Sequence, residues 1–330
     1  MVMSAPKEKL KVTSLPEPSP KSDELLVEVI SCGVCRTDLH VFDGELTKPK
    51  LPLVLGHEII GRVAKIGSSV STFKTGELVG VPWLGKTCGH CRFCLSHQEN
   101  LCDNAIFTGY TRDGGYEELA IANQNFCFAL PDKYDPIHSA PLMCAGLIGW
   151  RSYRMIGKTI GDAENIGIYG FGGAAHILTQ ILHQQGKKVF AFSRNDDERT
   201  RSFAKNVGAT WSGKSGQKPP ELLDATIIFA PVGELVLDSL KVLRKGGAVI
   251  CGGIHMSDIP PIPYDLLWGE RTIRSVANLT REDGLDFMKI LNRYPIKVET
   301  HQYELEDANT ALDDLRAGRF DGAAVLKIRS

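Results

Sequence analysis

Four cysteines stand within one short stretch of the chain, and this cluster limits the fold more than any other feature of the sequence. Their spacing is C-x2-C-x2-C-x7-C, and the cluster comprises Cys88, Cys91, Cys94 and Cys102. Four thiolates this close in sequence can surround one tetrahedral Zn²⁺ and leave no coordination position open. The surrounding segment, residues 85–104, is polar and loop-like, so a bound metal would replace the apolar core that it lacks. The cluster therefore predicts a closed, structural zinc site.

Two disulfides or an iron–sulfur cluster are the alternatives for four neighbouring cysteines. The first residues of the chain are charged and lack the apolar core of a secretory signal. No stretch approaches the roughly 18 to 20 apolar residues that a membrane-spanning helix needs. We therefore expect a cytoplasmic protein with reduced thiols, which argues against disulfides. The last spacing also differs from the bacterial ferredoxin pattern with its closing Cys-Pro, which argues against an iron–sulfur cluster.

The charge balance excludes several classes of partner. The 330-residue chain has 38 Lys and Arg against 39 Asp and Glu, a formal net charge of −1. Such a chain has no electrostatic footprint for nucleic acid or for an anionic membrane surface. At this length two domains are expected, each able to bury its own core. We therefore expect a globular enzyme that acts on a small molecule.

Two kinds of hydrophobic pattern divide the chain near Gly146. Before it, between residues 55 and 81, short apolar runs separated by glycines predict a compact, mainly β, barrel-like domain. After it, apolar strand segments alternate with helical patterns, which predicts a doubly wound parallel sheet. The expected strands of this sheet are Ile166–Tyr169, Val189–Phe192, Thr226–Ala230, Ala248–Cys251 and Thr272–Val276. A helix ended by Gly318 and a last strand, Ala324–Ile328, are expected near the end of the chain.

A second group of residues could bind a metal ion, although each is weak evidence alone. It comprises Cys35, the pair His57 and Glu58, and Cys144. An isolated cysteine in an apolar context is usually a small core residue. Two thiolates and one imidazole from distant segments would, however, form the Cys₂His set of a catalytic zinc with its fourth position free. Water or an alcohol oxygen could occupy that position and lose its proton near neutral pH.

A glycine-rich turn follows the first expected strand of the parallel sheet and opens its clearest helix. The pattern Gly170-x-Gly172-x-x-Ala175, with Gly173 inside it, fits the G-x-G-x-x-G/A fingerprint of dinucleotide-binding proteins. The glycines allow a tight turn and let a pyrophosphate approach the helix N-terminus. In this strand–turn–helix setting, the motif predicts a nicotinamide dinucleotide site.

The end of the next strand bears on which dinucleotide binds. Ser193 and Arg194 stand where an NAD enzyme usually has an Asp or Glu for the ribose 2′-hydroxyl. A small neutral residue followed by Arg suits a 2′-phosphate, which a guanidinium binds in a bidentate manner. We therefore favour NADP over NAD. The alternative is that Arg194 stacks on the adenine while Asp196 or Asp197 holds the ribose.

These segments, in this order and around the four-cysteine cluster, resemble the zinc-dependent alcohol dehydrogenases of the medium-chain dehydrogenase/reductase superfamily over essentially the whole chain. The resemblance implies an α/β protein of two domains. One is a GroES-like, β-rich, zinc-binding catalytic domain of residues 1–146 and 294–330. The other is a Rossmann domain of residues 147–293, a doubly wound parallel sheet that binds the cofactor. The resemblance also implies a homo-oligomer, either a dimer or a tetramer.

The resemblance further implies which residues bind metal. Cys35, His57 and Cys144 would hold the catalytic zinc, so that the chain carries two Zn²⁺. Glu58 is similar to the family's glutamate that can coordinate zinc when its water is displaced. Asp38 matches the carboxylate that orients the ligand histidine, fixing its tautomer and raising its basicity.

Residues near the cofactor are implied in the same way. Arg36 resembles the family arginine that neutralises the cofactor pyrophosphate. The run Cys251-Gly252-Gly253 ends a strand where the family's backbone lines the nicotinamide. Thr37 and His40 resemble a proton relay that leads from a hydroxyl, through the cofactor ribose, to an imidazole at the surface.

The implied activity is reversible hydride transfer between a primary or secondary alcohol, bound to zinc as its alkoxide, and NAD(P). A zinc-dependent NADP aldehyde or polyol reductase of the same superfamily is an alternative, because it would use the same residues with a different pocket. A non-catalytic zinc-binding structural protein is another. The sequence departs from the family at Ile148 and Ala323, where many relatives carry a threonine beside the nicotinamide and an arginine facing the pyrophosphate.

Overall fold

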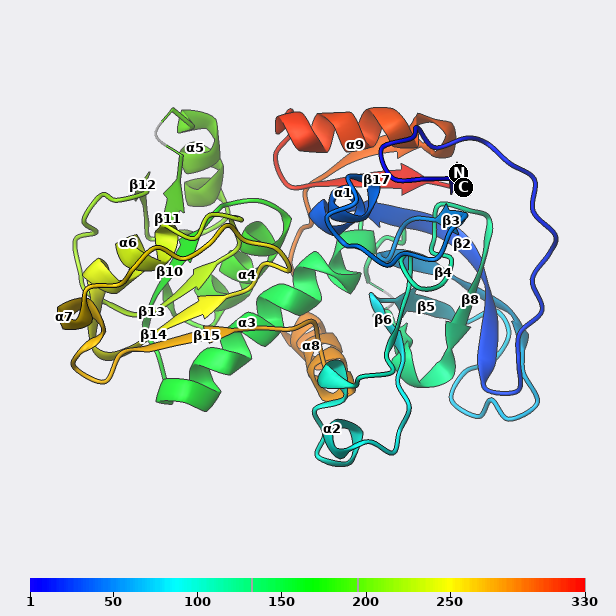
Figure 1. The fold of residues 1–330 in the computed structure, drawn as a ribbon, viewed down its shortest axis with the longest axis horizontal. Helices are drawn as coiled ribbons and strands as arrows, with labels where there is room; N and C mark the ends of the chain where they lie inside the picture. Colours follow the sequence, from blue (N-terminus) through cyan, green and yellow to red (C-terminus); the bar gives the residue numbers. More distant parts are fainter. Residues whose placement is uncertain (132, 195, 330) are drawn as a thin grey trace. The chain divides into compact units, whose positions relative to one another are not determined.

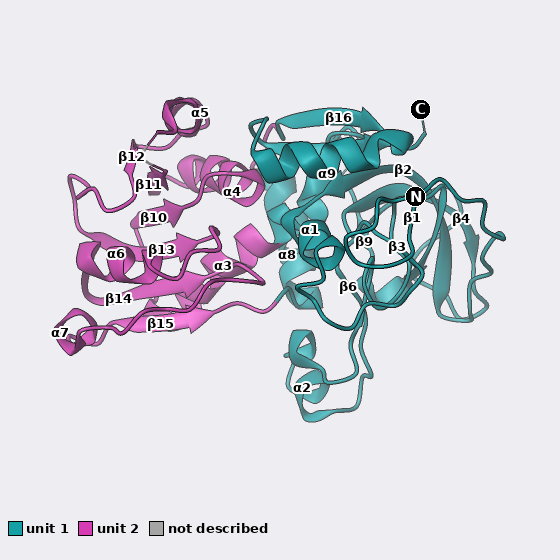
Figure 2. Ribbon diagram, turned by 45° about the horizontal axis from the view of Figure 1, so that its top comes forward, with its two compact units in different colours: residues 1–147, 278–293, 298–330 teal, residues 148–277, 294–297 magenta. Residues whose placement is uncertain are grey.

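The chain forms two compact units, which Figure 2 shows in different colours. The structure, a computed structural model, describes residues 1–131, 133–194 and 196–329. Unit 1 comprises residues 1–147, 278–293 and 298–330, and unit 2 comprises residues 148–277 and 294–297. Each unit is described by itself.

The division differs from the expected one at residues 278–293, which lie in unit 1 and not in the cofactor domain, and at residues 294–297, which lie in unit 2 and not in the catalytic domain. The first segment contains helix α8 (Arg281–Arg293). The helix lies against unit 1 because Phe287 covers Gly146 and Gly284 accommodates the ring of Phe128. The following short segment, residues 294–297, belongs to unit 2, where Gln180 Nε2 donates a hydrogen bond of 2.8 Å to the carbonyl of Lys297.

Unit 1 is built on a seven-stranded, mainly antiparallel sheet with the order β16-β17-β2-β4-β5-β9, in which β8 also pairs with β2. The long strand β2 is the centre of this sheet, because β4, β8 and β17 all pair with it. Its side chains are almost entirely buried, as expected for a strand covered on both faces. The strands are β1 (Val2–Met3), β2 (Glu24–Val34), β3 (Leu53–Val54), β4 (Ile59–Ile66), β5 (Leu78–Val81), β6 (Leu84–Lys86), β7 (Ile106–Phe107), β8 (Leu119–Asn123), β9 (Phe128–Ala129), β16 (Thr300–Glu304) and β17 (Ala323–Lys327).

Short helices connect many of these strands. Helix α1 follows β2 directly, and α9 lies along β16 and β17 (Figure 1). Helix α9 ends where Gly318 adopts a left-handed conformation with φ of 65°, as the sequence predicts. The helical elements of unit 1 are α1 (Arg36–Phe42), α2 (Arg92–Leu95), η1 (Glu99–Leu101), η2 (Gln124–Phe126), η3 (Ala140–Met143), α8, η4 (Leu305–Asp307) and α9 (Ala308–Ala317).

Unit 2 is a six-stranded parallel sheet with the order β12-β11-β10-β13-β14-β15, which confirms the expected doubly wound arrangement. Helices α4, α5 and α6 follow β10, β11 and β13 in turn (Figure 1). Strand β12 has no counterpart among the expected strands, because its four residues include only one large apolar side chain, Trp211. The strands are β10 (Asn165–Tyr169), β11 (Lys188–Ser193), β12 (Trp211–Lys214), β13 (Leu223–Ile228), β14 (Leu243–Cys251) and β15 (Thr272–Ser275). The helices are α3 (Ala145–Ile160), whose first turn belongs to unit 1, α4 (Gly173–Gln184), α5 (Glu198–Asn206), α6 (Leu235–Val242) and α7 (Tyr264–Leu267).

The described part of the chain contains no helix of the length and apolar character that crossing a bilayer would require.

Candidate metal and cofactor sites

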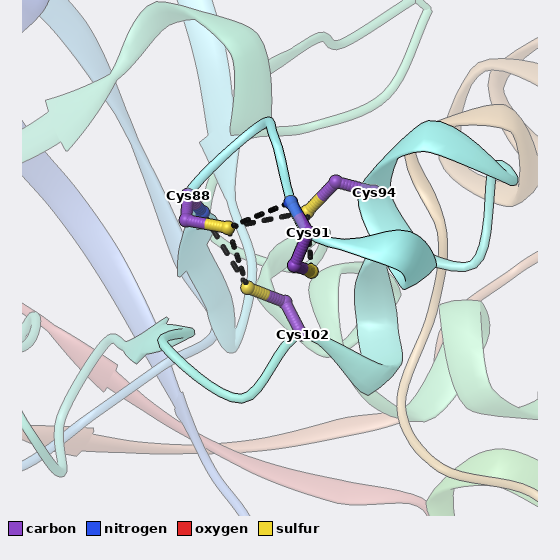
Figure 3. A group of neighbouring side chains, drawn as sticks. All are labelled: Cys88, Cys91, Cys94 and Cys102. Atoms are coloured by element: carbon purple, nitrogen blue, oxygen red, sulfur yellow. Dashed lines mark hydrogen bonds between the residues drawn. The ribbon is translucent and has the colours of Figure 1, made fainter.

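The four clustered cysteines converge in a lobe of unit 1 that we call the four-cysteine lobe, residues 85–104 (Figure 3). Cys88 precedes α2, and Cys91 is the N-cap residue of this helix. Cys94 lies within α2, and Cys102 follows η1. The sulfur of Cys88 is 3.9 Å from that of Cys94 and 3.5 Å from that of Cys102, and the sulfurs of Cys91 and Cys94 are 3.6 Å apart. Two sulfurs bound to one zinc at about 2.3 Å each, in tetrahedral geometry, would lie about 3.8 Å apart.

These distances also bear on the alternatives to a metal. A disulfide joins its sulfurs at about 2.0 Å, and all nine cysteines of the chain are free thiols in the structure. The backbone supports thiolate character, because the N–H of Cys91 donates to the sulfur of Cys88 at 3.4 Å. Hydrogen bonds from the N–H groups of His90 and Cys91 lower the pKa of the Cys88 thiol to about 6. The donor set therefore fits a closed tetrahedral metal.

The second group of metal-binding candidates is assembled from three separate segments of unit 1. Cys35 lies at the N-cap of α1, His57 and Glu58 precede β4, and Cys144 lies between η3 and α3. One ligand atom from each of these four residues lies within 4.8 Å of the corresponding atoms of the others. The sulfurs of Cys35 and Cys144 are 3.9 Å apart, again close to the edge of a zinc tetrahedron.

Asp38 holds two of these segments together. One of its carboxylate oxygens accepts a hydrogen bond from the backbone N–H of Cys35 at 2.8 Å, which closes a capping box at the start of α1. The other accepts from the backbone N–H of Gly56 at 3.2 Å and lies 3.2 Å from Nδ1 of His57. Asp38 is 1% exposed and His57 is completely buried, so this contact is shielded from water. The carboxylate thereby directs Nε2 of His57 away from itself.

Nε2 of His57 is a buried polar atom with no hydrogen-bond partner in the structure. Buried polar atoms are rarely left unsatisfied, so such an atom calls for an explanation. The neutral imidazole with Nδ1–H on Asp38 has a lone pair at Nε2, which is the form that binds a metal. With two thiols beside it, this nitrogen fits the Cys₂His donor set of an open zinc site.

The charges of this buried group depend on one another. Burial lowers the pKa of the His57 imidazole, but the carboxylate of Asp38 and the thiol of Cys35 outweigh it and raise that pKa well above its usual value. A hydrogen bond from the Cys144 thiol lowers the pKa of Cys35, and the same bond raises the pKa of Cys144. Burial, followed by the negative charge of Cys35, raises the pKa of Glu58. A cation among these groups would favour both thiolates together.

Glu58 occupies space that only a glycine neighbour allows. A Cβ on Gly33 would lie 1.7 Å from Oε2 of Glu58, so any larger residue at position 33 would displace the carboxylate. The backbone of Ala145, next to Cys144, only partly offsets the rise in the pKa of this carboxylate.

In unit 2 the glycine-rich turn joins β10 to α4 as the sequence predicts. Gly170 has a φ of 84°, and a Cβ there would lie 2.8 Å from the backbone nitrogen of Ala230. A Cβ on Gly172 would meet no atom within 4 Å, so the backbone at the start of α4 is open to a ligand. No side chain among the described residues caps this helix N-terminus. Because β10 and β13 are neighbours where the strand order reverses, the turn lies at the edge where such sheets bind dinucleotides.

Ser193 ends β11, and Arg194 is exposed just beyond it. The hydroxyl of Ser193 accepts a hydrogen bond of 3.3 Å from Nη1 of Arg201 in α5. Asp197 caps α5, because its carboxylate accepts from the backbone N–H of Thr200 at 3.0 Å. Three strands away in the same sheet, Cys251 is the last residue of β14, and the N–H of Gly252 donates to the carbonyl of Ile228.

Comparison with known proteins places this geometry in a family. Residues 21–132 match the family model of the alcohol dehydrogenase GroES-like domain. The probable alcohol dehydrogenase AdhA of Mycobacterium tuberculosis is 43% identical over 322 residues, which cover 96% of this chain and 91% of that protein. The chain belongs to the zinc-dependent alcohol dehydrogenases of the medium-chain dehydrogenase/reductase superfamily.

Solved structures of similar proteins agree with this family assignment. A CAD from Helicobacter pylori, complexed with NADP(H), has a TM-score of 0.89 at 22% identity, and the match covers 99% of this chain and 96% of that one. An acetophenone reductase from Geotrichum candidum, in complex with NAD, has a TM-score of 0.87 at 25% identity, with coverage of 99% and 96%. The chain is thus an α/β oxidoreductase with a GroES-like domain and a Rossmann domain.

The family's other expected site residues lie around the N-terminal half of α1. Arg36 is exposed at its first position, and the buried hydroxyl of Thr37 lies 4.0 Å from the sulfur of Cys35. The imidazole of His40, 12% exposed, contacts the carboxylate of Glu45 through Nδ1. Because unit 1 carries Arg36 and unit 2 carries Gly170–Ala175, their shared role toward a cofactor stays a prediction.

Three residues of the site were not found from the sequence. Glu45, which pairs with His40, and Gly33, which makes room for Glu58, carry no recognisable motif. Trp83 carries no recognisable motif either. It packs its ring edge-on against His57, with ring centroids 5.1 Å apart, and stacks on Phe107. Only the three-dimensional contact reveals these partners, because each is distant in sequence or lies in a loop.

Proposed function

We propose that this enzyme catalyses reversible hydride transfer between a primary or secondary alcohol and NADP, giving an aldehyde or a ketone, with a zinc ion held by Cys35, His57 and Cys144. The observation that carries the proposal is the buried donor set, in which two sulfurs 3.9 Å apart lie beside the unsatisfied Nε2 of His57. A second zinc would occupy the four-cysteine lobe. The lobe's fourfold thiol set leaves no position for a substrate, so chemistry is assigned to the first site.

When bound, the zinc supplies a Lewis acid that acidifies a hydroxyl or polarises a carbonyl, and the nicotinamide supplies the hydride acceptor or donor. The protein supplies orientation. Asp38 holds the imidazole of His57 in the tautomer whose Nε2 can bind metal. Glu58, fixed above Gly33, is a reserve oxygen ligand beside the two sulfurs.

Thr37 and His40 handle the proton that alcohol oxidation releases. The hydroxyl of Thr37 is buried within α1 next to Cys35, where it can accept a hydrogen bond from a substrate hydroxyl and pass on its own proton as it takes up that of the substrate. His40 lies one turn further along the same helix and is half-buried, so its imidazole can exchange a proton with solvent. Glu45 orients this imidazole through its contact with Nδ1.

The preference for NADP is supported by the end of β11. No carboxylate replaces Ser193 at the strand end, and Asp197 is already engaged as the cap of α5. Two guanidinium groups, of Arg194 and Arg201, belong to this region, and Arg201 already contacts the Ser193 hydroxyl. Arginine binds a phosphate in a bidentate manner, whereas a ribose hydroxyl would require an acceptor. We therefore assign the 2′-phosphate to Ser193 and Arg194.

A pair of variants tests this assignment. Arg194→Ala should lower kcat/KM for NADP about 10- to 100-fold while changing kcat/KM for NAD little, because a charge-assisted hydrogen bond is lost only with NADP. Ser193→Asp should lower use of NADP and raise use of NAD. Equal losses with both cofactors would contradict the assignment of a 2′-phosphate site.

The decisive experiment for the activity is a spectrophotometric screen of alcohols and aldehydes with NAD(H) and NADP(H), with and without a chelator. We expect turnover that the chelator abolishes and that added zinc restores. Oxidation of alcohols separates a dehydrogenase from a reductase that accepts only aldehydes or polyol precursors. Two zinc ions per chain are expected, and a value near one with no turnover would favour a non-catalytic zinc protein. We expect a homo-oligomer, dimer or tetramer, as measured by light scattering.

A further inference from the structure

A buried carboxylate joins the four-cysteine lobe to the rest of unit 1. Glu99 lies in η1, between the third and fourth cysteines of the lobe, and its side chain is 8% exposed. Its oxygen Oε1 accepts a hydrogen bond of 2.8 Å from the backbone N–H of Arg281. The side chain of Arg281 adds an ion pair, with its Nε 3.6 Å from the same oxygen. The Arg281 side chain is 48% exposed, so water screens the ion pair, and the main loss on removing Glu99 would be the acceptor of the backbone N–H.

The atom that Glu99 contacts is the first N–H of helix α8. The N–H groups of a helix's first turn have no partner within the helix. Thr280 and Asp283 satisfy part of this need as a capping box, since the hydroxyl of Thr280 accepts from the N–H of Asp283 at 3.2 Å and Asp283 accepts from the N–H of Thr280 at 2.9 Å. Glu99 provides the acceptor for the next donor, and its negative charge faces the positive end of the helix dipole. In Figure 1 the lobe, drawn in cyan, meets this end of α8, drawn in orange.

The middle of α8 packs tightly against the segment that carries Cys144. A Cβ on Gly146 would lie 2.7 Å from Cζ of Phe287, so the ring rests directly on the backbone two residues after Cys144. Phe287 is completely buried. A Cβ on Gly284 would lie 2.1 Å from the ring of Phe128, so the helix is fixed on a second side in the same way. Closely packed contacts of this kind pass on small displacements, because no side chain can yield.

We propose that Glu99 is a positioning residue, which through α8 and Phe287 fixes the backbone of Cys144 and so couples the four-cysteine lobe to the other metal site. The proposal rests on Cys144 being a ligand of the catalytic metal, as argued above. The lobe then has a second role besides local stability, because ordering of the lobe presents Glu99 to α8. Glu99 itself touches neither metal nor substrate.

Hydrogen exchange in the full-length protein tests the coupling without reference to activity. We compare Glu99→Ala with Glu99→Gln, which keeps an oxygen acceptor for the Arg281 N–H, and with Glu282→Gln, which removes an exposed carboxylate from the same turn of α8. Glu99→Ala should speed exchange about 2- to 30-fold in residues 140–150 and 281–287, the range for coupling through packed side chains. Glu99→Gln should restore most of the protection, and Glu282→Gln should match the native protein. Faster exchange confined to residues 85–104 would overturn the coupling.

Cobalt substitution provides a second measurement at the metal itself. A cobalt ion bound by two thiolates and an imidazole absorbs differently from one bound by four thiolates, so the two sites can be followed separately. Glu99→Ala should release cobalt from the Cys35, His57 and Cys144 site to a chelator about 2- to 30-fold faster than the native protein. An unchanged release rate from this site would contradict the proposal. If native protein binds no cobalt there yet exchange still spreads to residues 140–150, the proposed metal site fails while the coupling through α8 stands.

Discussion

The two groups of cysteines in this protein use similar sulfur geometry for different purposes. In the four-cysteine lobe all candidate ligands come from one stretch of 15 residues, and the shell of four thiols is complete. In the other group, Cys35 and Cys144 are 109 residues apart in sequence, and the donors number two thiols, one imidazole and one carboxylate. The first arrangement can form locally once a metal is present. The second exists only after the whole of unit 1 has folded.

The two groups also differ in their exposure to solvent and in the contacts that surround them. The lobe lies in loops, and three of its four cysteines are half-exposed. His57 of the Cys35 group contacts Asp38 and Trp83, which come from two separate segments, and is completely buried. A site whose geometry is imposed by the fold can keep one coordination position open, because the protein and not the metal holds the donors apart. The comparison therefore assigns stability to the lobe and chemistry to the Cys35 group.

The largest effect on activity is expected from Cys35→Ala. Turnover should fall by about a thousandfold or more, because the Lewis-acid contribution of the metal is worth several kcal/mol. Metal analysis should find one zinc lost and one retained. The circular dichroism spectrum and the unfolding temperature should stay close to native values. Turnover within tenfold of native would contradict the assignment of chemistry to this group.

The matching change in the lobe is Cys91→Ala, which should act on stability. We expect the unfolding temperature to fall by about 5 to 10 °C, which corresponds to roughly 2 to 3 kcal/mol for a domain of this size. With excess zinc present to keep the Cys35 group loaded, kcat should remain within a few fold of native. Calorimetry and steady-state kinetics measure the two effects. A large fall in kcat at saturating zinc, with little change in unfolding temperature, would reverse the roles of the two groups.

A smaller effect is expected from Asp38→Asn, which keeps the shape of the side chain and removes its charge. Asp38 contacts Nδ1 of His57 and accepts hydrogen bonds from the backbone N–H groups of Cys35 and Gly56. Zinc affinity should therefore fall about 10- to 100-fold. Competition with a chelator measures this affinity. Glu17→Gln is the control, because Glu17 forms an exposed ion pair with Lys65 in the same unit. The lobe has no such supporting carboxylate contact on a cysteine ligand in the residues described, so its zinc should dissociate at an unchanged rate.

The same contrast explains what the sequence could and could not predict. The lobe was evident from the spacing of Cys88 to Cys102, because its structure is local. The expected strands of unit 2 were confirmed for a similar reason, since each is a short apolar run next to a turn. The association of Cys35 with Cys144 came from the family resemblance alone. No periodicity in the sequence brings together residues that are joined through a folded barrel.

Helix α8 could have been predicted from the sequence, although it was not. Residues 284, 287, 288 and 291 follow a helical spacing and Thr280 with Asp283 forms a capping box. For this reason the expected domain boundary at residue 293 differs from the boundary of the two compact units. Glu99 had no signal of its own, because a polar residue in a loop is ordinarily exposed. Its burial follows from the distant N-terminus of α8, which only the fold brings near.

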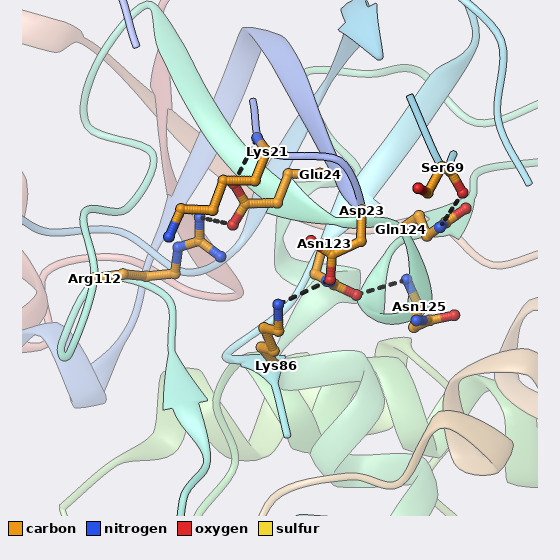
Figure 4. A network of polar contacts seen from close by, with 9 residues as sticks. All are labelled: Lys21, Asp23, Glu24, Ser69, Lys86, Arg112, Asn123, Gln124 and Asn125. Carbon is orange, nitrogen blue, oxygen red and sulfur yellow. Dashed lines mark hydrogen bonds and ion pairs between the residues drawn. The ribbon is translucent and has the colours of Figure 1, made fainter. Parts of the chain in front are cut away.

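The smallest effect should come from the other polar attachment of the lobe. Lys86, at the start of the lobe, pairs with Asp23 at 2.8 Å, and Asn123 donates to the same carboxylate (Figure 4). Both partners of the ion pair are about one-third exposed, so water and salt screen the attraction and such pairs contribute roughly 0 to 1 kcal/mol. Lys86→Met should lower the unfolding temperature by at most about 4 °C in low salt and less in high salt. It should leave hydrogen exchange in residues 140–150 unchanged. Equal effects of Lys86→Met and Glu99→Ala on that segment would mean that any loosening of the lobe reaches Cys144, and that the route through α8 has no special part in it.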